Sequence, residues 1–508
     1  MSDWTGGYVT DIGYTYGYYP ELNPVRVKLA FLHNGLMFPH FGTACELGFG
    51  QGVSTNIHAA ASATRWYGTD FHPSQAGFAR ELADASGADV HLYDEAFADF
   101  ANRPDVPEFD YIGLHGLWSW ISDGNREVIV DFIRRKLKVG GVLYASYNTF
   151  PGLSAFAPMR HLMAQHAEII GAQGHGIVKR IDGALAFAEK LLATNPAYVR
   201  ANSQIAEKFI KMKGQNRHYL AHEYFNRDWH PVHFATMAKA LASAKVSYAC
   251  SAHYPDHLDA LNLRGEQRAF LHSVPDPMLR ETVRDFMVNQ SFRRDYWVKA
   301  PHKLSPLEQV EALRAERVVL AGHRPQSIVG ALGEATTSDA INSPILDLLA
   351  DHKAWTLSQI ESGVRDKGVT FPQVVNAAMV LIGSGRVVAA QDDSVVAKAR
   401  GQADRLNAHL NNRARSDNDV EYLASPITGG AIPVGRIEQL FLLAVRQGMK
   451  QPAEWAQTAW QIFGAQGQKF VKDGKVIEAA EENLAELTSE ASNFADQKLP
   501  ILKALLVA

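Results

Sequence analysis

In the first part of the chain, short apolar runs alternate with stretches whose apolar residues recur at helical spacing. This alternation predicts parallel strands connected by helices. The predicted strands are 43–47, 65–69, 90–93, 109–114 and 142–147, and the predicted helices around them are 25–32, 53–63, 73–86 and 126–137. Two later stretches, 246–250 and 292–298, are also predicted to be strands and complete the sheet. We therefore predict an α/β fold built on one seven-stranded sheet.

The rest of the chain is mainly helical. Helices are predicted at 159–170, 183–192 and 201–212, which is more chain than a crossover between two strands needs. This helical insertion either completes a substrate pocket or forms a dimer contact. Beyond the sheet, helices at 345–350, 357–365 and 371–383 precede a strand at 386–390, a pattern typical of a winged helix. Few basic residues lie there, which favours protein contact or packing over DNA binding.

These patterns divide the chain into four parts. They are a sheet domain at 1–156 and 216–300, a helical insertion at 157–215, a winged-helix-like middle domain at 301–396, and a mainly helical C-terminal domain at 397–508. In the last part, 397–419 is predicted to be a helix and linker. The acidic run 478–490 is predicted to be a solvent-exposed helix face.

The first predicted strand runs into Gly48-Phe49-Gly50-Gln51-Gly52, where missing side chains let the backbone turn sharply and approach a ligand closely. The helix that follows offers free N–H groups at its N-terminus. A dinucleotide site usually has the spacing G-x-G-x-x-G, whereas this loop has G-x-G-x-G and follows Glu46. A carboxylate there disfavours a pyrophosphate and suits a sulfonium with an amino group. The loop favours S-adenosylmethionine over NAD; a glycine turn without a ligand is the alternative.

Further candidates lie at the ends of the next strands and before the first one. Asp70 ends the second strand, where it is placed to accept hydrogen bonds from ribose hydroxyls. An acidic and an apolar residue after the third strand are candidates to hold the adenine. The early tyrosines at 8, 14, 16, 18 and 19 either cover the cofactor as a lid or pack outside the sheet. The predicted cofactor-binding residues are Tyr19, Glu46, Gly48, Gly50, Gly52, Asp70, Phe71, Asp94, Glu95, Ala96, His115 and Gly116.

Composition narrows the functional class. The chain has 508 residues and a net charge of −4, which gives no electrostatic footprint for nucleic acid. Its two cysteines, Cys45 and Cys250, lie in no metal-ligand pattern, so no metal site is predicted. No apolar run reaches the roughly 20 residues that span a bilayer, and the start of the chain lacks the basic and apolar regions of a signal peptide. We therefore expect a cytoplasmic enzyme of several domains.

Six stretches of the sequence resemble one protein family. They are the glycine loop at 46–52, FDYIGLHGLWSW at 109–120, YASYNTFPG at 144–152, HEYFN at 222–226, NQSFRRD at 289–295 and ASPITGG at 424–430. The combination resembles the class I methyltransferases that carry a methyltransferase regulatory domain, which include rickettsial protein-lysine methyltransferases acting on outer-membrane surface proteins. In one departure, relatives place Asn directly after the third glycine, where this chain has Val53-Ser54-Thr55-Asn56.

The resemblance implies a Rossmann-like catalytic domain, a helical insertion that can form a homodimer, and middle and C-terminal domains that help to select the substrate. The implied activity is S-adenosylmethionine-dependent methyl transfer to a protein lysine. Two other classes stay open: methyl transfer to a glycan or small metabolite, and a non-catalytic protein that senses S-adenosylmethionine.

The residues expected at the reacting methyl group follow the fourth and fifth strands, because ligands bind at the carboxyl ends of parallel strands. His115 is either the acceptor of the lysine proton or a structural histidine bonded to the adjacent turn. Trp118, Trp120 and Tyr147 are expected to line a dry acceptor channel, which would lower the pKa of a lysine. Asn148 either orients the acceptor or caps its turn. The predicted catalytic residues are His115, Trp118, Tyr147 and Asn148.

Overall fold

The computed structural model describes residues 8–508 except 172, 338 and 473–474. The start of the chain, considered above for a signal peptide, lies outside these residues. Within the described part of the chain, no helix is both long enough and apolar enough to cross a membrane.

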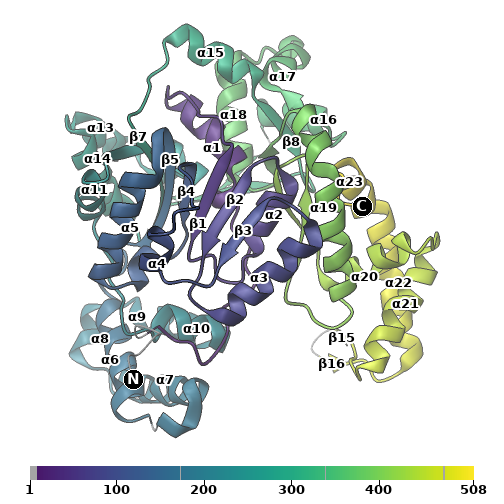
Figure 1. Cartoon of the computed structure of the whole chain (residues 1–508), viewed down its shortest axis with the longest axis horizontal. Helices are drawn as coiled ribbons and strands as arrows, with labels where there is room; N and C mark the ends of the chain where they lie inside the picture. Colours follow the sequence, from purple (N-terminus) through teal and green to yellow (C-terminus); the bar gives the residue numbers. More distant parts are fainter. Residues whose placement is uncertain (1–7, 172, 338, 473–474) are drawn as a thin grey trace.

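A mixed seven-stranded sheet forms the centre of the molecule (Figure 1). Its strands are β1 (Thr43–Leu47), β2 (Arg65–Thr69), β3 (Val90–Tyr93), β4 (Phe109–Leu114), β5 (Leu137–Asn148), β6 (Val246–Ser251) and β7 (Phe292–Lys299). Across the sheet the order is β3-β2-β1-β4-β5-β7-β6. Strands β1 to β5 run parallel, and β7 is antiparallel to both of its neighbours. The predicted α/β fold with one seven-stranded sheet is confirmed.

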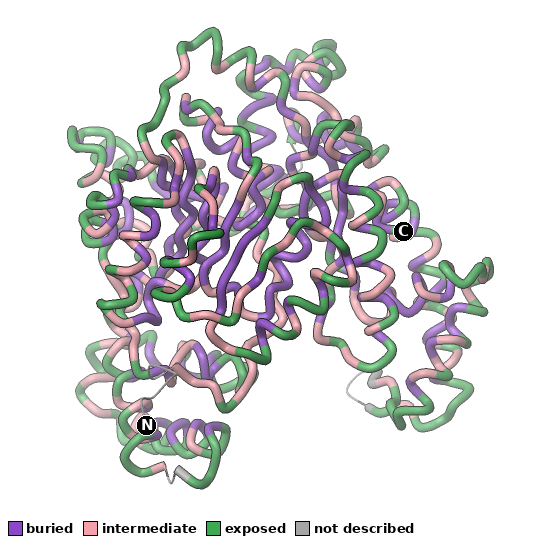
Figure 2. The backbone as a smooth tube through the Cα atoms, viewed as in Figure 1, coloured by how far each residue is buried: buried purple, intermediate pink, exposed green. Residues whose placement is uncertain are grey.

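Helices cover the sheet, and its central strands are buried (Figure 2). Those nearest the sheet are α1 (Pro24–His33), α2 (Val53–Ala61), α3 (Pro73–Ser86), α4 (Phe97–Ala101), α5 (Asp123–Lys136) and α11 (Phe234–Ala242). Phe132 of α5 and Met237 of α11 belong to one core, and Phe31 of α1 belongs to another. Along β5, Tyr144 and Ala145 fall into these two cores in turn, because successive strand side chains point to opposite faces.

Between β5 and β6 the chain forms a helical insertion beside the N-terminal segment (Figure 1). Its helices are α6 (Ala157–Ile169), α7 (Gly176–Ala193), α8 (Ala197–Ala201), α9 (Ile205–Lys213) and α10 (Arg217–Tyr224). Met163 and Ile181 lie in a core of their own, and Val9 and Ile12 pack against it. The helix predicted from residue 201 is in fact interrupted, because α8 ends there and α9 begins at Ile205. Three more helices, α12 (Asp259–Asn262), α13 (Gly265–Ser273) and α14 (Pro277–Val288), separate β6 from β7.

The middle part contains the predicted three helices and final strand, together with strands that the apolar pattern missed. Its elements are α15 (Pro306–Ala315), β8 (Arg317–Leu320), β9 (Ser327–Gly330), β10 (Gly333–Thr336), α16 (Asn342–Leu349), β11 (Trp355–Thr356), α17 (Leu357–Gly363), α18 (Phe371–Gly383) and β12 (Val387–Ala389). The missed strand β8 lies between β11 and β12 in a small sheet. Such a short apolar run cannot be assigned by periodicity alone. The winged-helix comparison stays a prediction.

The C-terminal part packs against helices of the sheet domain. It comprises α19 (Asp393–Arg413), β13 (Tyr422–Ser425), β14 (Gly430–Pro433), α20 (Arg436–Arg446), α21 (Pro452–Ala465), β15 (Val471–Lys472), β16 (Lys475–Val476), α22 (Ala480–Asn493) and α23 (Leu499–Ala504). Helix α19 packs against α2 and α3. The side-chain amide of Gln402 donates to the carbonyls of Ala59 at 3.0 Å and Ser62 at 2.7 Å. Most of the stretch predicted as helix and linker is therefore one helix, which packs against α2, the helix that follows the glycine loop.

Candidate active site

A cavity of about 310 Å³ lies at the carboxyl ends of the parallel strands. It is lined by the glycine loop after β1, by Asp70 after β2, by Glu95 after β3 and by His115 after β4. A wider cleft of about 790 Å³ lies among the C-terminal helices, but none of the predicted site residues lines it. The cavity at the strand ends is therefore the candidate active site, as expected for an open parallel sheet.

The glycine loop has the geometry that its sequence requires. Gly48, Gly50 and Gly52 have φ of +71°, +57° and +67°, a region that favours glycine. A Cβ on Gly52 would lie 2.5 Å from the Cβ of Ala79, so this glycine also lets α2 approach α3. The Gly50 N–H donates to Oδ2 of Asp70 at 2.8 Å. The loop is thereby tied to the end of β2.

Two buried carboxylates lie beside this loop. Oδ1 of Asp70 accepts the backbone N–H of His72 at 3.0 Å, and the hydroxyl of Thr55 donates to Oε2 of Glu46. Burial raises the pKa of Asp70 to about 6. Burial, with a contribution from the nearby Asp70 charge, raises the pKa of Glu46 to about 8. A ligand that carries positive charge would stabilise the ionised form of both carboxyl groups.

These residues fit S-adenosylmethionine. The glycine loop leaves room for close approach by a ligand, and the lining contains carboxylates suited to hydroxyls, an amino group and a sulfonium. The residues that would hold it are Tyr19, Glu46, Gly48, Gly50, Gly52, Asp70, Phe71, Glu95, Ala96, His115 and Gly116, all of which line the cavity. Phe97, which was not among the predicted residues, lies next to Ala96 and lines it too.

Asp94 is the one predicted cofactor residue that the structure places outside the cavity. Its carboxylate pairs with Arg80 at 2.6 Å, and the side chain is 45% exposed. The neighbouring Glu95 lines the cavity instead and pairs with Arg103 at 2.6 Å. Asp94 and Glu95 are consecutive residues at the end of β3. Their side chains therefore point in different directions, and only one of them faces the cavity.

His115 lies in the wall of the cavity. Its ring stacks on Tyr19, with ring centroids 3.8 Å apart, and its Nδ1 lies 2.9 Å from the hydroxyl of Tyr144. Burial lowers the pKa of His115 to about 4, so the imidazole is neutral near pH 7. The N–H of the next residue, Gly116, donates to Oγ of Ser146 at 2.7 Å. His115 is thus both a cavity residue and a hydrogen-bonded structural one.

The other three predicted catalytic residues do not line the cavity. Trp118 is buried in the core that contains Phe132. The hydroxyl of Tyr147 donates to Oδ2 of Asp295 at 2.7 Å on the opposite face of β5 from Tyr144. Asn148 accepts the N–H of Val232 through its backbone carbonyl. The expected channel is corrected accordingly: strand alternation turns Tyr144 and Ser146, rather than Tyr147, toward His115.

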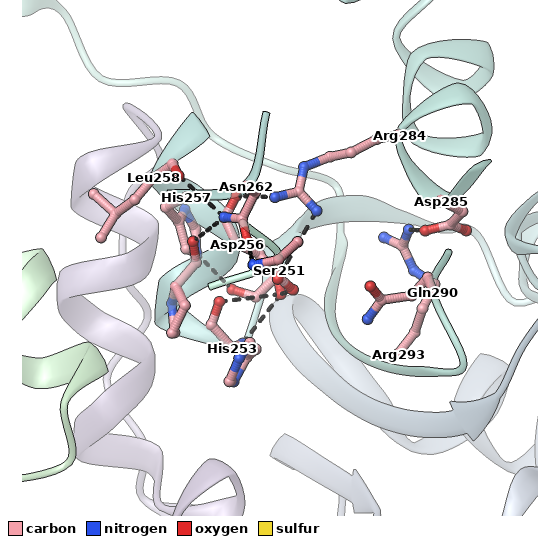
Figure 3. A network of polar contacts seen from close by, with 12 residues as sticks. Ser251, His253, Asp256, His257, Leu258, Asn262, Arg284, Asp285, Gln290 and Arg293 are labelled. Atoms are coloured by element: carbon pink, nitrogen blue, oxygen red, sulfur yellow. Dashed lines mark hydrogen bonds and ion pairs between the residues drawn. The ribbon is translucent and has the colours of Figure 1, made fainter. Parts of the chain in front are cut away.

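Tyr147 belongs instead to a buried polar cluster around Arg293 of β7. This guanidinium contacts Asp285 at 2.6 Å and Asp295 and Glu281 at 2.9 Å each. Figure 3 shows Arg293 beside Asp285, in the same region as the contacts among Ser251, Asp256 and Arg284. The cluster joins β5, β7 and α14, which indicates a structural role.

The early tyrosines divide between the two expected roles. Tyr8, Tyr14 and Tyr19 line the cavity, as a lid would. The other two pack elsewhere: Tyr16 packs against Phe78. Tyr18 packs against His58 and Tyr422. The lining tyrosines are held over the site by α10, because Nδ1 and Nε2 of His222 lie 3.2 Å from the Tyr8 hydroxyl and 3.0 Å from the Ile12 carbonyl.

The sequence reasoning assigned no role to several residues of the lining. Glu223 lies next to His222 on α10 and accepts a hydrogen bond from the Tyr14 hydroxyl at 3.2 Å. In the sequence, Glu223 is marked only by its position in the HEYFN stretch, which resembles the methyltransferase family. Others in the lining are Gln51, Ser54, Gln75, Leu117, Ile121, Ser122, Asn125 and Asp228; Trp120, expected in an acceptor channel, also lines it.

The charged side chains of the cavity lining are acidic. Its five carboxylates are Glu46, Asp70, Glu95, Glu223 and Asp228. Among the described residues that line it, there is no lysine or arginine. Since phosphates are usually held by such basic side chains, the cavity is built for cationic or neutral ligands.

Comparisons with known proteins place the chain in a family. A family model described as a predicted methyltransferase regulatory domain matches residues 216–299. The uncharacterized protein sll1526 of Synechocystis is 38% identical to this chain, over 99% of each chain. The uncharacterized protein RP028 of Rickettsia prowazekii is 30% identical over 26% of this chain and 54% of its own length.

The fold matches that of a solved structure over nearly the whole length of the chain. PKMT2 from Rickettsia typhi has a TM-score of 0.70 and 17% identity, covering 97% of this chain and 100% of its own. The structure of the same protein in complex with AdoHcy gives a TM-score of 0.69. The match extends beyond the central sheet to the helical parts. The chain therefore belongs to one family with the Synechocystis protein, carries the methyltransferase regulatory domain, and has the fold of S-adenosylmethionine-dependent methyltransferases.

Proposed function

We propose that this methyltransferase methylates the amine of a lysine side chain in a protein. The observation that carries the proposal is the charge of the cavity, with five carboxylates and no lysine or arginine among its described lining residues. The sulfonium donor and an ammonium acceptor are both cations, and a cleft of one sign raises the local concentration of the opposite charge. A glycan hydroxyl carries no charge, so this long-range attraction does not act on it.

The proposed roles follow from the positions of the side chains. S-adenosylmethionine supplies a methyl group on a positively charged sulfur. Asp70 accepts ribose hydroxyls, and Glu46 attracts the cationic end of the ligand. The aromatic faces of Tyr14 and Trp120 exclude water and attract an ammonium by cation–π interaction. Most of the rate then comes from holding the acceptor nitrogen in line with the methyl group.

A labelling experiment tests this function. Purified protein, methyl-labelled S-adenosylmethionine and separate protein, glycan and metabolite fractions of a cell extract are incubated, and the products are analysed by mass spectrometry. We expect the label in the protein fraction, on lysine nitrogen. Label on a sugar or metabolite would contradict the proposed acceptor. Cofactor binding without any transfer would favour the non-catalytic sensor.

The affinity for S-adenosylmethionine is expected to fall as the pH falls below about 8. Glu46 is neutral below its pKa of about 8, so a cationic ligand must displace a proton before pairing with the carboxylate. The loss approaches about tenfold per pH unit for one linked proton. Calorimetric titrations between pH 6.5 and 9 measure it. In Glu46→Gln, binding is expected to be weaker and nearly independent of pH over this range; a wild-type affinity that is flat in pH contradicts the assignment.

A further inference from the structure

We propose that Glu223 is a catalytic residue, the group that accepts the proton of the acceptor ammonium before methyl transfer. The inference rests on the proposed function, since it takes an amine to be the acceptor. It also gives the segment matched as a regulatory domain a direct part in the reaction, because Glu223 lies within residues 216–299.

The geometry places this carboxylate close to the glycine loop. Tyr14 forms the connection: its hydroxyl donates to Oε1 of Glu223 at 3.2 Å, and its carbonyl accepts the side-chain amide of Gln51 at 3.1 Å. A Cβ on Gly50 would lie 3.7 Å from the ring of Tyr14. Glu223 is thus one aromatic side chain away from the loop, and both line one cavity.

The other carboxylates of the lining are engaged differently. Asp70 accepts two backbone N–H groups. Glu46 accepts one hydroxyl, as Glu223 does, but it lies beside the glycine loop, where the proposed function assigns it to the cofactor. Glu95 pairs with Arg103. Asp228 lies near Arg227 at 3.6 Å and His230 at 3.5 Å. Paired carboxylates are poor bases, because a neighbouring positive charge stabilises the ionised form.

The basicity of Glu223 suits the task better than that of His115. Burial raises the pKa of Glu223 to about 7, whereas it lowers the pKa of His115 to about 4. A lysine ammonium with a pKa near 10.4 would give its proton to Glu223 against a gap of about 3 pKa units, and to His115 against about 6. A general base works best with a pKa near the working pH.

The groups that face Glu223 do not titrate in the same pH range. They are Tyr8, Tyr14 and Tyr19 from the N-terminal segment and Tyr219, His222 and Tyr224 from α10. Burial holds the pKa of each of these tyrosines above its usual value of 10. Burial lowers the pKa of His222 to about 4. Across the cavity, Asp70 and Glu46 titrate near 6 and 8, but they act on cofactor binding.

The proposed step moves one proton. An N–H bond of the ammonium breaks, its electron pair stays on nitrogen, and a new O–H bond forms on the Glu223 carboxylate. The products are a neutral amine with a free lone pair and a neutral carboxyl group, so charge and atoms balance. The tyrosine rings of the lining attract the ammonium by cation–π interaction before this step, and they provide an apolar surrounding for the neutral amine after it.

The test compares Glu223→Gln with Glu207→Gln, a matched change at an exposed residue of α9 that pairs with Lys211 at 2.8 Å. Both variants are assayed under single-turnover conditions with saturating S-adenosylmethionine and the protein fraction of a cell extract, from pH 6 to 9. We expect the wild type and Glu207→Gln to rise to a plateau above an apparent pKa near 7. Glu223→Gln should be slower at pH 7 by about 10²- to 10⁴-fold and should rise with pH throughout, because its amine must deprotonate in water.

Two binding measurements supply readouts other than activity. The affinity for S-adenosylhomocysteine should be unchanged in Glu223→Gln, which also shows that the variant is folded. With S-adenosylhomocysteine present, n-butylammonium at pH 8 should bind at least tenfold more weakly to Glu223→Gln than to the wild type. A wild-type pH profile or unchanged n-butylammonium affinity in Glu223→Gln would overturn the inference. Absence of lysine methylation by the wild type would instead overturn the proposed function.

Discussion

Replacing Arg293 by alanine is expected to lower the free energy of unfolding by about 3–5 kcal/mol, because it leaves buried carboxylates without their counter-charge. The Arg293 side chain is 5% exposed and contacts Glu281, Asp285 and Asp295 within 3 Å, at 2.6 to 2.9 Å. The carboxylates of Asp285 and Asp295 are almost completely buried. Without the guanidinium they would repel one another or bind protons. Chemical denaturation followed by circular dichroism measures the change.

Arg134→Ala provides the control for this prediction. Arg134 pairs with Asp131 at 2.6 Å, but both side chains are about half exposed. Exposed pairs contribute little, since water screens their attraction. The denaturation midpoint of Arg134→Ala should equal that of the wild type. An equal midpoint in Arg293→Ala would mean that the cluster adds nothing to stability and that the packing around Tyr147 is set by apolar contacts alone.

Asp70→Asn is expected to weaken binding of S-adenosylmethionine and S-adenosylhomocysteine by about 1.5–3 kcal/mol, or about 10- to 150-fold. One cause is the loss of charge-assisted hydrogen bonds to the ribose. Another is local: the two carboxylate oxygens accept the N–H groups of Gly50 and His72, and an amide has only one accepting oxygen. Its NH₂ group would face a backbone donor and displace either the loop or the turn. Calorimetry at pH 8 measures the affinity.

Asp94→Asn is the matched comparison, since it makes the same change at the end of the neighbouring strand. Asp94 is exposed and pairs with Arg80 outside the cavity, so its loss should leave cofactor affinity unchanged. If Asp94→Asn weakened binding and Asp70→Asn did not, the assignment of the ribose site to the end of β2 would be wrong.

The sequence alone was sufficient for the sheet and the glycine loop. The bounds predicted for the strands 43–47, 65–69, 90–93 and 109–114 agree with β1 to β4, and the predicted helix 73–86 agrees with α3. These features are local: apolar runs bounded by turns form strands, and glycine is favoured where φ is positive. The position of Asp70 at the end of β2 is likewise local, whereas its contact with Gly50 comes from the pairing of β2 with β1.

Only the tertiary structure decided which side chains reach the cavity. Strand β5 is buried on both faces, so its apolar pattern does not indicate which alternate residues face the ligand, and a shift of one residue exchanges the faces. Tyr144 faces His115, whereas Tyr147 faces Asp295. Glu223 reaches the site from α10, far along the chain, through its contact with Tyr14. Local sequence determines which secondary structure each segment prefers. The contacts of Tyr144, Tyr147 and Glu223 depend instead on how segments far apart in the chain pack, and this packing is a property of the whole fold.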